Sequence, residues 1–534
     1  MDELNIGLAF SGGGYRAATF DLGALSFLNS IRLEDGRTLL SCVSAMSSVS
    51  GGSIPAMKYM FAMAHGQDVE EMVKELYGFL CNEDLVARAL QGLSAEKANR
   101  EASSIKIMAG IYDECLFGGA VMGDIIDNFD KIPVKDFTAL ATDFDNSLPF
   151  RFRLTEGKMT TGQRLSYGVF GNKRHSIGRC VVRHITPGEA LASSSCFPCG
   201  FEPMMYPDDF NVSQIPDVAS TIKSRFGLMD GGVVDNQGIG PILLAEERMR
   251  KYRADRSRKD KALDLIIISD VASPYMDGYA PSEPLLPGWA GKLTMGRLRN
   301  YGLISEAVMI ALFILALVLG NSFWTGVVSV FLAVVTLLNL AGALLKNKMF
   351  RAIGKTFIGN NATFISHLKL ATLENLLMNR AKSVIMMSSE VFLKRMRSMN
   401  YENVYEDKKW RNRAVTSTVY ALRPGERWES HRDKGTLPAE LVPSEAVQQN
   451  SEIAADFGTT LWFTAADKAA GKPAALFAAG QYTVCYSLLA YINKIEKDHT
   501  NLNSAHAAII AIKPQLQSAW QQFQKNPQWM VPKV

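Results

Sequence analysis

Short apolar runs recur along the chain, and the stretches between them place their apolar residues at helical spacing. Each run has the length of a buried β-strand, and the run at 265–269 (LIIIS) suits a sheet that is covered on both faces. The intervening stretches predict amphipathic helices. The alternation therefore predicts an α/β fold. Strands are expected at 4–10, 39–46, 137–142, 265–269 and 415–422, and helices at 17–28, 54–64, 69–80 and within 363–399.

One uncharged segment, residues 307–345, interrupts this pattern. It contains 39 residues without a single Asp, Glu, Lys or Arg. One membrane span needs about 20 apolar residues, so the segment has room for two. Gly320-Asn321-Ser322 is a turn signal inside it. The pattern predicts a transmembrane helical hairpin with spans at about 303–319 and 323–345.

Positive charge on both sides of this segment predicts its orientation. Because basic residues favour the cytosolic side, both ends of the hairpin and the domain attached to them should face the cytosol. The protein is then an integral membrane protein. One long buried or re-entrant helix is the alternative. The flanking basic residues are Lys292, Arg297 and Arg299 before the segment and Lys346, Lys348, Arg351 and Lys355 after it.

Composition narrows the class of protein further. The 534 residues carry a net charge of +4, which is too close to balance to indicate a nucleic-acid partner. The 7 cysteines are few and odd in number, so a disulfide framework is not expected. Cys196 and Cys199 form a CxxC without a second pair, and the histidines show no ligand spacing. No metal and no other cofactor is expected.

The first pattern with chemical meaning is Ser11-Gly12-Gly13-Gly14-Tyr15-Arg16, between a predicted strand and a predicted helix. Glycines let the backbone turn sharply and expose successive N–H groups, and a helix N-terminus adds positive dipole. Such a loop stabilises an anion, either a phosphate or a developing oxyanion. Nucleotide binding is the weaker interpretation, because the phosphate-loop Lys and Ser/Thr and a GxGxxG are missing. A tight turn without chemistry is the default alternative.

The second pattern, residues 47–52 (SSVSGG), fits a nucleophile elbow between a strand and a helix. An elbow needs small residues two positions before and after the nucleophile, and Ser48 and Gly52 meet that need around Ser50. Gly51 follows the nucleophile directly. Three nearby serines are rival nucleophiles, and a polar loop is the alternative. These rivals are Ser47, Ser48 and Ser53.

The third pattern is Asp230-Gly231-Gly232, a turn signal by default. As chemistry, it places a carboxylate on a rigid loop whose glycines permit close approach of a serine.

In this order the three patterns resemble the patatin-like phospholipases and the related cytosolic phospholipases A2. The segments 141–143 (ATD) and 190–198 (ALASSSCFP) are also similar to that family. The resemblance covers about 4–280 and 361–495. It implies a patatin-like three-layer fold, a sheet with helices on both faces, which the hairpin interrupts. The expected domains are a catalytic domain at 1–282, a membrane insertion at 283–360, a mainly helical second part of the catalytic domain at 361–495 and a C-terminal tail at 496–534.

Carried over by position, the resemblance implies a serine lipid acyl hydrolase with a Ser-Asp dyad and an acyl-enzyme. Ser50 would be the nucleophile and Asp230 its base. Where the family's elbow begins with glycine, this chain has Ser48. The oxyanion hole would comprise Gly12, Gly13, Gly14 and Arg16, the elbow Ser48, Gly51 and Gly52, and the Asp-Gly-Gly motif Gly231 and Gly232.

The hairpin then indicates where the substrate is found. A catalytic domain anchored in the bilayer meets lipid esters at high local concentration, so phospholipid or another acyl lipid is the expected substrate. Two alternatives stay open, a conventional Ser-Asp-His hydrolase and a non-catalytic membrane scaffold. An oligomer is compatible with the sequence.

Overall fold

The computed structural model divides the chain into two compact units. Unit 1 comprises Met1–Tyr275 and Val391–Val534, and unit 2 comprises Met276–Glu390. The unit that contains the apolar helices ends at Glu390, and the expected domain boundaries stay predictions. The described residues are 4–95, 103–156, 166–198, 200–212, 224–252, 262–276, 278–283, 285–349, 367–498 and 504–533.

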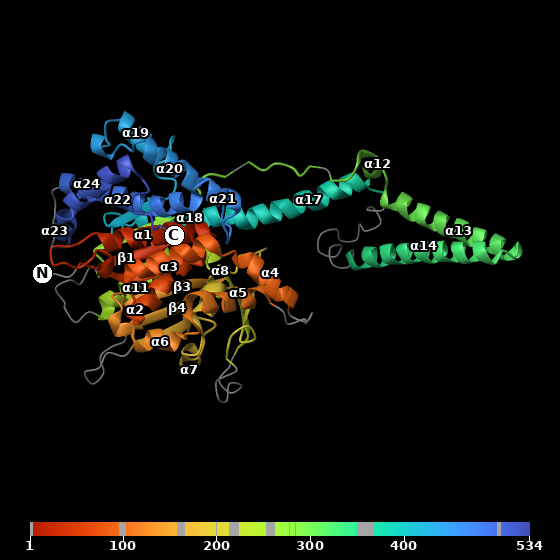
Figure 1. The fold of residues 1–534 in the computed structure, drawn as a ribbon, viewed down its shortest axis with the longest axis horizontal. Helices are drawn as coiled ribbons and strands as arrows, with labels where there is room; N and C mark the ends of the chain where they lie inside the picture. Colours follow the sequence, from red (N-terminus) through yellow and green to blue (C-terminus); the bar gives the residue numbers. More distant parts are fainter. Residues whose placement is uncertain are drawn as a thin grey trace. The chain divides into compact units, whose positions relative to one another are not determined.

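A mixed nine-stranded sheet forms the centre of unit 1 (Figure 1). Its main order is β5-β4-β3-β2-β1-β8-β9, in which β9, β8, β1, β2 and β3 run parallel, β4 pairs antiparallel with β3, and β5 pairs antiparallel with β4. The short strand β7 pairs antiparallel with the end of β3 and with β6. The strands are β1 (Ile6–Phe10), β2 (Val43–Val49), β3 (Asp136–Asp143), β4 (Leu148–Glu156), β5 (Ser166–Gly171), β6 (Met204–Tyr206), β7 (Phe226–Asp230), β8 (Leu265–Asp270) and β9 (Ala414–Thr418).

Both faces of this sheet are covered, as the continuous apolar strands predicted. Along β8, Leu265 and Ile267 belong to one hydrophobic cluster, while Ile266 and Ile268 belong to another. Alternate side chains of a strand point to opposite faces, so each face has its own core. Residues of α1 (Gly14–Ser30) and α22 (Lys472–Asp498) contribute to the first cluster, and residues of α11 (Ile239–Tyr252) and α18 (Phe392–Tyr405) to the second.

Further helices of unit 1 surround this sheet (Figure 1). The predicted helices at 54–64 and 69–80 correspond to α2 and α3. These helices are α2 (Ser53–Ala64), α3 (Val69–Asn82), α4 (Leu85–Ala95), α5 (Ser104–Tyr112), α6 (Met122–Asp127), α7 (Arg179–Val182), α8 (Pro187–Ser195), α10 (Gly232–Asp235), α19 (Arg427–Asp433), α20 (Glu445–Ala455), α21 (Ala465–Ala469), α23 (Ser504–Ala511) and α24 (Lys513–Lys525).

The C-terminal helix α24 is part of the core of unit 1. Trp520 and Phe523 of α24 are buried. The ring of Phe523 lies 5.9 Å from the ring of Phe27 in α1. Helix α24 therefore packs against α1 within this core.

Unit 2 contains the apolar helices α13 (Met295–Val318) and α14 (Ser322–Met349), which pack against each other around a turn at Gly320 (φ 60°). The apolar stretches of these two helices have mean hydropathies of 2.3 and 2.0, and only 6% and 0% of each stretch is buried inside the protein. A third apolar helix, Lys472–Lys497, is 83% buried, so its apolar surface belongs to the core of unit 1. Unit 2 also contains α12 (Gly288–Gly291) and α17 (Leu370–Met386).

A polar cluster joins the two apolar helices. The carboxylate of Glu306 accepts hydrogen bonds from the Thr336 hydroxyl at 3.1 Å and the Asn339 amide at 2.9 Å. The Asn339 amide also donates to the Gly302 carbonyl at 3.0 Å. Glu306 thus has partners within the hairpin. The flanking residues Arg351 and Lys355 and the expected boundary at 360 lie outside the described residues.

Candidate active site

The residues expected to act together follow the ends of two strands that meet on β3. Val49, the last residue of β2, pairs with Leu140, and Asp230, the last residue of β7, pairs with the next β3 residue, Ala141. Because β2 runs parallel and β7 antiparallel to β3, the carboxyl ends of β2 and β7 approach each other head-on. Ser50 follows Val49, so this register brings Ser50 next to Asp230.

Ser50 occupies a strained turn between β2 and α2. Its φ of 49° lies in the left-handed region, which costs a non-glycine residue about 1–3 kcal/mol. The side chain is not sealed off completely, since Ser50 is 8% exposed. A Cβ on Gly51 would overlap the Gly14 carbonyl oxygen, and one on Gly52 would lie 2.5 Å from the Ser11 carbonyl oxygen. The turn therefore needs both glycines.

Asp230 is a buried carboxyl group in contact with Ser50. The Ser50 side chain lies close enough to this carboxyl group to lower its pKa, and the Gly232 N–H donates to its Oδ1 at 2.7 Å. Loss of hydration on burial raises the pKa of Asp230 to about 6, although Ser50 and the Gly232 N–H act in the opposite direction. The group is consequently a much better proton acceptor near neutral pH than an exposed aspartate.

The Asp-Gly-Gly loop fits tightly against β3. A Cβ on Gly231 would overlap the Leu140 carbonyl oxygen, and one on Gly232 would lie 2.9 Å from the Asp230 Oδ1. The Thr142 hydroxyl donates to the Asp230 carbonyl at 2.7 Å. These contacts fix the backbone that carries the carboxyl group.

The three glycines after β1 have different environments. The Gly12 N–H donates to the Asn236 carbonyl at 2.9 Å, so it is already used inside the protein. A Cβ on Gly12 would lie 3.1 Å from the Cβ of Ser50, which shows how closely the loop approaches the elbow. Within the described part of the chain, the N–H groups of Gly13 and Gly14 have no hydrogen-bond acceptor. Gly14 (φ 57°) lies directly against Gly51.

Arg16 lies in the first turn of α1 and is buried. Its Nη1 donates to the Tyr420 hydroxyl and to the Phe457 carbonyl, each at 3.0 Å. The guanidinium therefore connects the glycine loop with the part of unit 1 that follows unit 2 in the sequence. Its expected place in an oxyanion hole stays a prediction.

The rival serines have other environments. The Ser47 hydroxyl donates to the Gly238 carbonyl at 2.5 Å, and the Ser53 hydroxyl lies 3.0 Å from the Ser194 hydroxyl. The Ser48 hydroxyl is buried and has no partner among the described residues. Of the four candidates, Ser50 is the one that contacts Asp230 and has the strained φ.

Two residues near the dyad were not identified as site residues from the sequence. The Ser194 hydroxyl accepts a hydrogen bond from the Ser50 N–H at 2.9 Å, and the Asn236 carbonyl binds the Gly12 N–H. The sequence did carry a signal for Ser194, since it lies in the ALASSSCFP segment. For Asn236 the only signal was its place six residues after Asp230.

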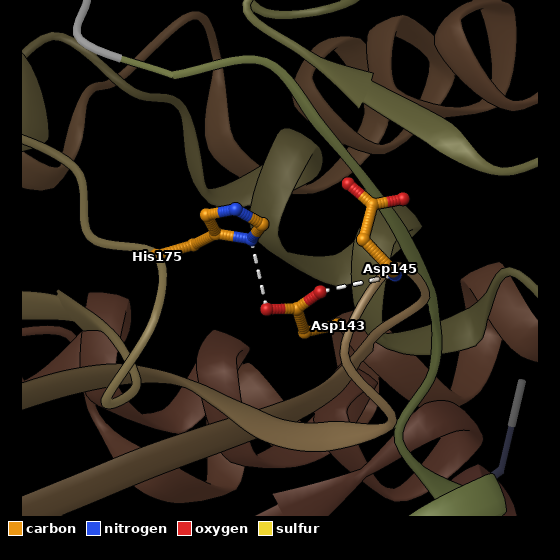
Figure 2. A group of neighbouring side chains, drawn as sticks. All are labelled: Asp143, Asp145 and His175. Atoms are coloured by element: carbon orange, nitrogen blue, oxygen red, sulfur yellow. Dashed lines mark hydrogen bonds and ion pairs between the residues drawn. The ribbon is translucent and has the colours of Figure 1, made fainter.

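A second polar cluster lies at the other end of the β3–β7 pairing. Asp143, Asp145 and His175 have potential ligand atoms within 4.8 Å of one another (Figure 2). The Asp143 carboxylate already pairs with the His175 Nδ1 at 2.9 Å and accepts the backbone N–H groups of Asp145 and Asn146, each at 3.1 Å. These hydrogen bonds stabilise the turn that follows β3, and this structural role accounts for the cluster. Of the CxxC cysteines, Cys196 bonds to the Glu202 carbonyl, and Cys199 lies outside the described residues.

Comparison with known proteins identifies the class of this domain. Residues 8–243 match the family model described as patatin-like phospholipase. This region contains the glycine loop, the elbow and the Asp-Gly-Gly loop. Residues 8–243 thus form a domain of the patatin-like phospholipase family, which confirms the resemblance and the fold class that it implied.

Solved structures with a similar arrangement include the human GIVD cytosolic phospholipase A2, with 14% identity and a TM-score of 0.30. Its complex with methyl gamma-linolenyl fluorophosphonate has 16% identity and a TM-score of 0.25. These matches cover 50% of this chain and 43% and 40% of those chains, which is less than half their length. No curated protein sequence matches the chain. The family assignment rests on the family model.

Proposed function

We propose that this protein is a serine lipid acyl hydrolase that cleaves carboxylic esters of membrane lipids with the dyad Ser50–Asp230. The observation that carries the proposal is a serine on a strained turn that lies close enough to a buried carboxyl group to lower its pKa, which burial raises to about 6. This contact favours the dyad over the conventional Ser-Asp-His hydrolase.

The reaction begins with attack of the Ser50 Oγ on the ester carbonyl carbon while the Asp230 carboxylate accepts the hydroxyl proton. The negative charge on the substrate oxygen is stabilised by the N–H groups of Gly13 and Gly14 at the positive end of α1. When the intermediate collapses, Asp230 returns the proton to the leaving alcohol. An acyl-enzyme on Ser50 remains.

Hydrolysis of the acyl-enzyme reverses these roles. Asp230 accepts a proton from water as the water oxygen attacks the acyl carbonyl, and the same N–H groups hold the second oxyanion. Collapse expels the Ser50 Oγ, which takes the proton back, and the fatty acid leaves. No other group is needed to balance the two half-reactions.

We further propose that α13 and α14 anchor the protein in a membrane. Their 23- and 20-residue apolar stretches are long enough to cross the hydrocarbon core, and almost none of this surface is buried within the protein. The basic residues on both flanks favour a cytosolic position for both ends of the hairpin. The anchor would hold the catalytic domain near phospholipid or another acyl lipid.

The test is an assay of full-length protein with phospholipid vesicles, combined with fluorophosphonate labelling. Ser50→Ala should lower fatty acid release at least about a thousandfold, because it removes the nucleophile. Ser193→Ala is a matched control, since it removes a buried serine hydroxyl that donates to the Glu189 carbonyl at 2.8 Å rather than to the dyad. The control should keep the wild-type rate.

Two results would contradict the proposal. Equal fatty acid release by wild type and Ser50→Ala would exclude Ser50 as the nucleophile. A folded wild type that neither releases fatty acid nor reacts with fluorophosphonate would support the non-catalytic scaffold.

A further inference from the structure

The end of helix α8 contacts both halves of the dyad. The Ser194 hydroxyl accepts the Ser50 N–H at 2.9 Å, while the Ser194 carbonyl accepts the Gly231 N–H at 3.2 Å. Two residues later, the Cys196 carbonyl accepts the Asp230 N–H at 2.9 Å. One turn of chain therefore binds the backbone of the nucleophile and the backbone of the base.

The Ser194 side chain also binds the sheet between the two loops. Its hydroxyl donates to the carbonyl of Leu140 at 2.7 Å, and Leu140 is the β3 residue that pairs with Val49. The Ser194 hydroxyl thus donates its proton to the Leu140 carbonyl of β3 and accepts a hydrogen bond from the Ser50 N–H. Ser194 is completely buried, so water cannot replace either bond.

The strained backbone of Ser50 explains why such a contact is needed. A left-handed φ at a serine persists only where neighbouring contacts outweigh its cost. Without the Ser194 hydroxyl, the Ser50 N–H would lose the acceptor that fixes its peptide plane. A buried N–H without an acceptor costs about 1–3 kcal/mol, so the turn would move to find another partner.

We propose that Ser194 is a positioning residue. Its hydroxyl is bound to β3 and holds the Ser50 N–H, which keeps the Ser50 hydroxyl directed at Asp230. The inference rests on the proposed hydrolase function, because it assigns Ser194 a role in the reactivity of Ser50. Ser194 itself does not touch the substrate.

The neighbouring serines provide a matched control. Ser193 donates to the Glu189 carbonyl at 2.8 Å and Ser195 to the Leu191 carbonyl at 2.8 Å, both within α8. All three side chains are buried. Ser193→Ala therefore deletes the same atom from the same buried helix without touching the Ser50 N–H.

The experiment measures fluorophosphonate labelling of full-length wild type, Ser194→Ala, Ser193→Ala and Ser50→Ala. The end point of labelling gives the fraction of competent molecules, and the second-order rate constant gives the reactivity of each competent site. For Ser194→Ala we expect the rate constant to fall about 10- to 100-fold at an unchanged end point, because the nucleophile is displaced. The kcat of ester hydrolysis should fall equally with KM unchanged, and Ser193→Ala should match wild type.

Each other outcome has a defined meaning. A wild-type rate constant for Ser194→Ala would overturn the inference, and the proposed function would stand as long as wild type reacts and Ser50→Ala does not. A lower end point with an unchanged rate constant would also overturn it, because that result indicates a folding role only. If wild type were not labelled, both the proposed function and the inference would be excluded.

Discussion

Asp230 is the residue whose protonation should set the pH dependence of the reaction. Burial is the main cause that raises its pKa to about 6, and the nearby Ser50 side chain and the Gly232 hydrogen bond limit the rise. Only the ionised carboxylate can accept the Ser50 proton. Below the pKa the group already carries a proton, and above it the base is available.

We therefore expect kcat/KM for a soluble short-chain ester to fall about tenfold per pH unit below pH 6 and to be constant above about pH 7. The measurement is a pH–rate profile between pH 4.5 and 8.5, with thermal unfolding followed at each pH to confirm a folded protein. A profile that is flat through pH 6, or that falls as pH rises through 6, would contradict the role of Asp230 as base. Asp230→Asn should lose the inflection together with the activity.

The sequence could predict the local geometry of residues whose conformation depends only on their immediate neighbours in the chain. The sharp turn at Ser50 could be predicted because an elbow needs small residues at fixed offsets, and a Cβ on Gly51 or Gly52 would come too close to a backbone carbonyl oxygen. The use of the Gly12 N–H by Asn236 could not be predicted, because it depends on a contact between residues 224 positions apart in the chain. Ser194 and the partners of Arg16 were missed for the same reason.

At the scale of elements, long periodic segments were easier to predict than short strands. Helix α2 begins one residue before the predicted position, and β1 ends where the apolar run ends. Strand β2 was expected at 39–46, but a short turn of helix occupies Leu40–Cys42 and the strand runs on to Val49. That shift matters, because it brings the end of the strand directly to Ser50.

The strand β7 was not predicted, although it carries Asp230. It has only five residues, and its place next to β3 exists because β2 ends at Val49. Strands β4, β5 and β6 were also absent from the sequence analysis, which emphasised continuous apolar runs. In β4, residues buried to different degrees follow one another, and such a strand gives a weaker signal.

The contact between α1 and α22 supplies a prediction at this scale. A Cβ on Gly23 would overlap the Phe477 carbonyl oxygen, and one on Gly480 would overlap the Phe20 carbonyl oxygen. The two helices therefore touch backbone to backbone. Gly23→Ala and Gly480→Ala should each lower the free energy of unfolding by about 1–3 kcal/mol, because an extra methyl group must push the helices apart.

The measurement is denaturant or thermal unfolding of the two variants beside Gly110→Ala. Gly110 is an exposed residue of α5 with nothing within 4 Å of its added Cβ. The same substitution there should raise stability by up to about 1 kcal/mol, since alanine favours a helix more than glycine does. If all three variants behaved alike, close packing of α1 on α22 would be excluded as the cause.

At the scale of the whole molecule, the two units differ in whether their apolar helices are buried. Unit 1 buries its apolar helix α22, whereas α13 and α14 of unit 2 leave their apolar residues exposed. An exposed apolar surface of this length is not stable in water, because about 20 residues per helix would be hydrated. A bilayer removes that cost and leaves the helical backbone fully hydrogen-bonded.

The proposed anchor can be tested by placing one arginine near the middle of each apolar helix. Leu312→Arg with Leu338→Arg puts two charges where the hydrocarbon core would be, and each charge costs about 2.5–3.5 kcal/mol in a spanning helix. Wild type should stay with the membrane after alkaline carbonate extraction, and the double variant should move largely to the supernatant or aggregate fraction. Met399→Arg with Ile453→Arg, which changes exposed apolar residues of unit 1, should leave the distribution unchanged. Release of wild type by carbonate would show instead that a protein surface covers the hairpin, and lipid hydrolysis would then require another route to the bilayer.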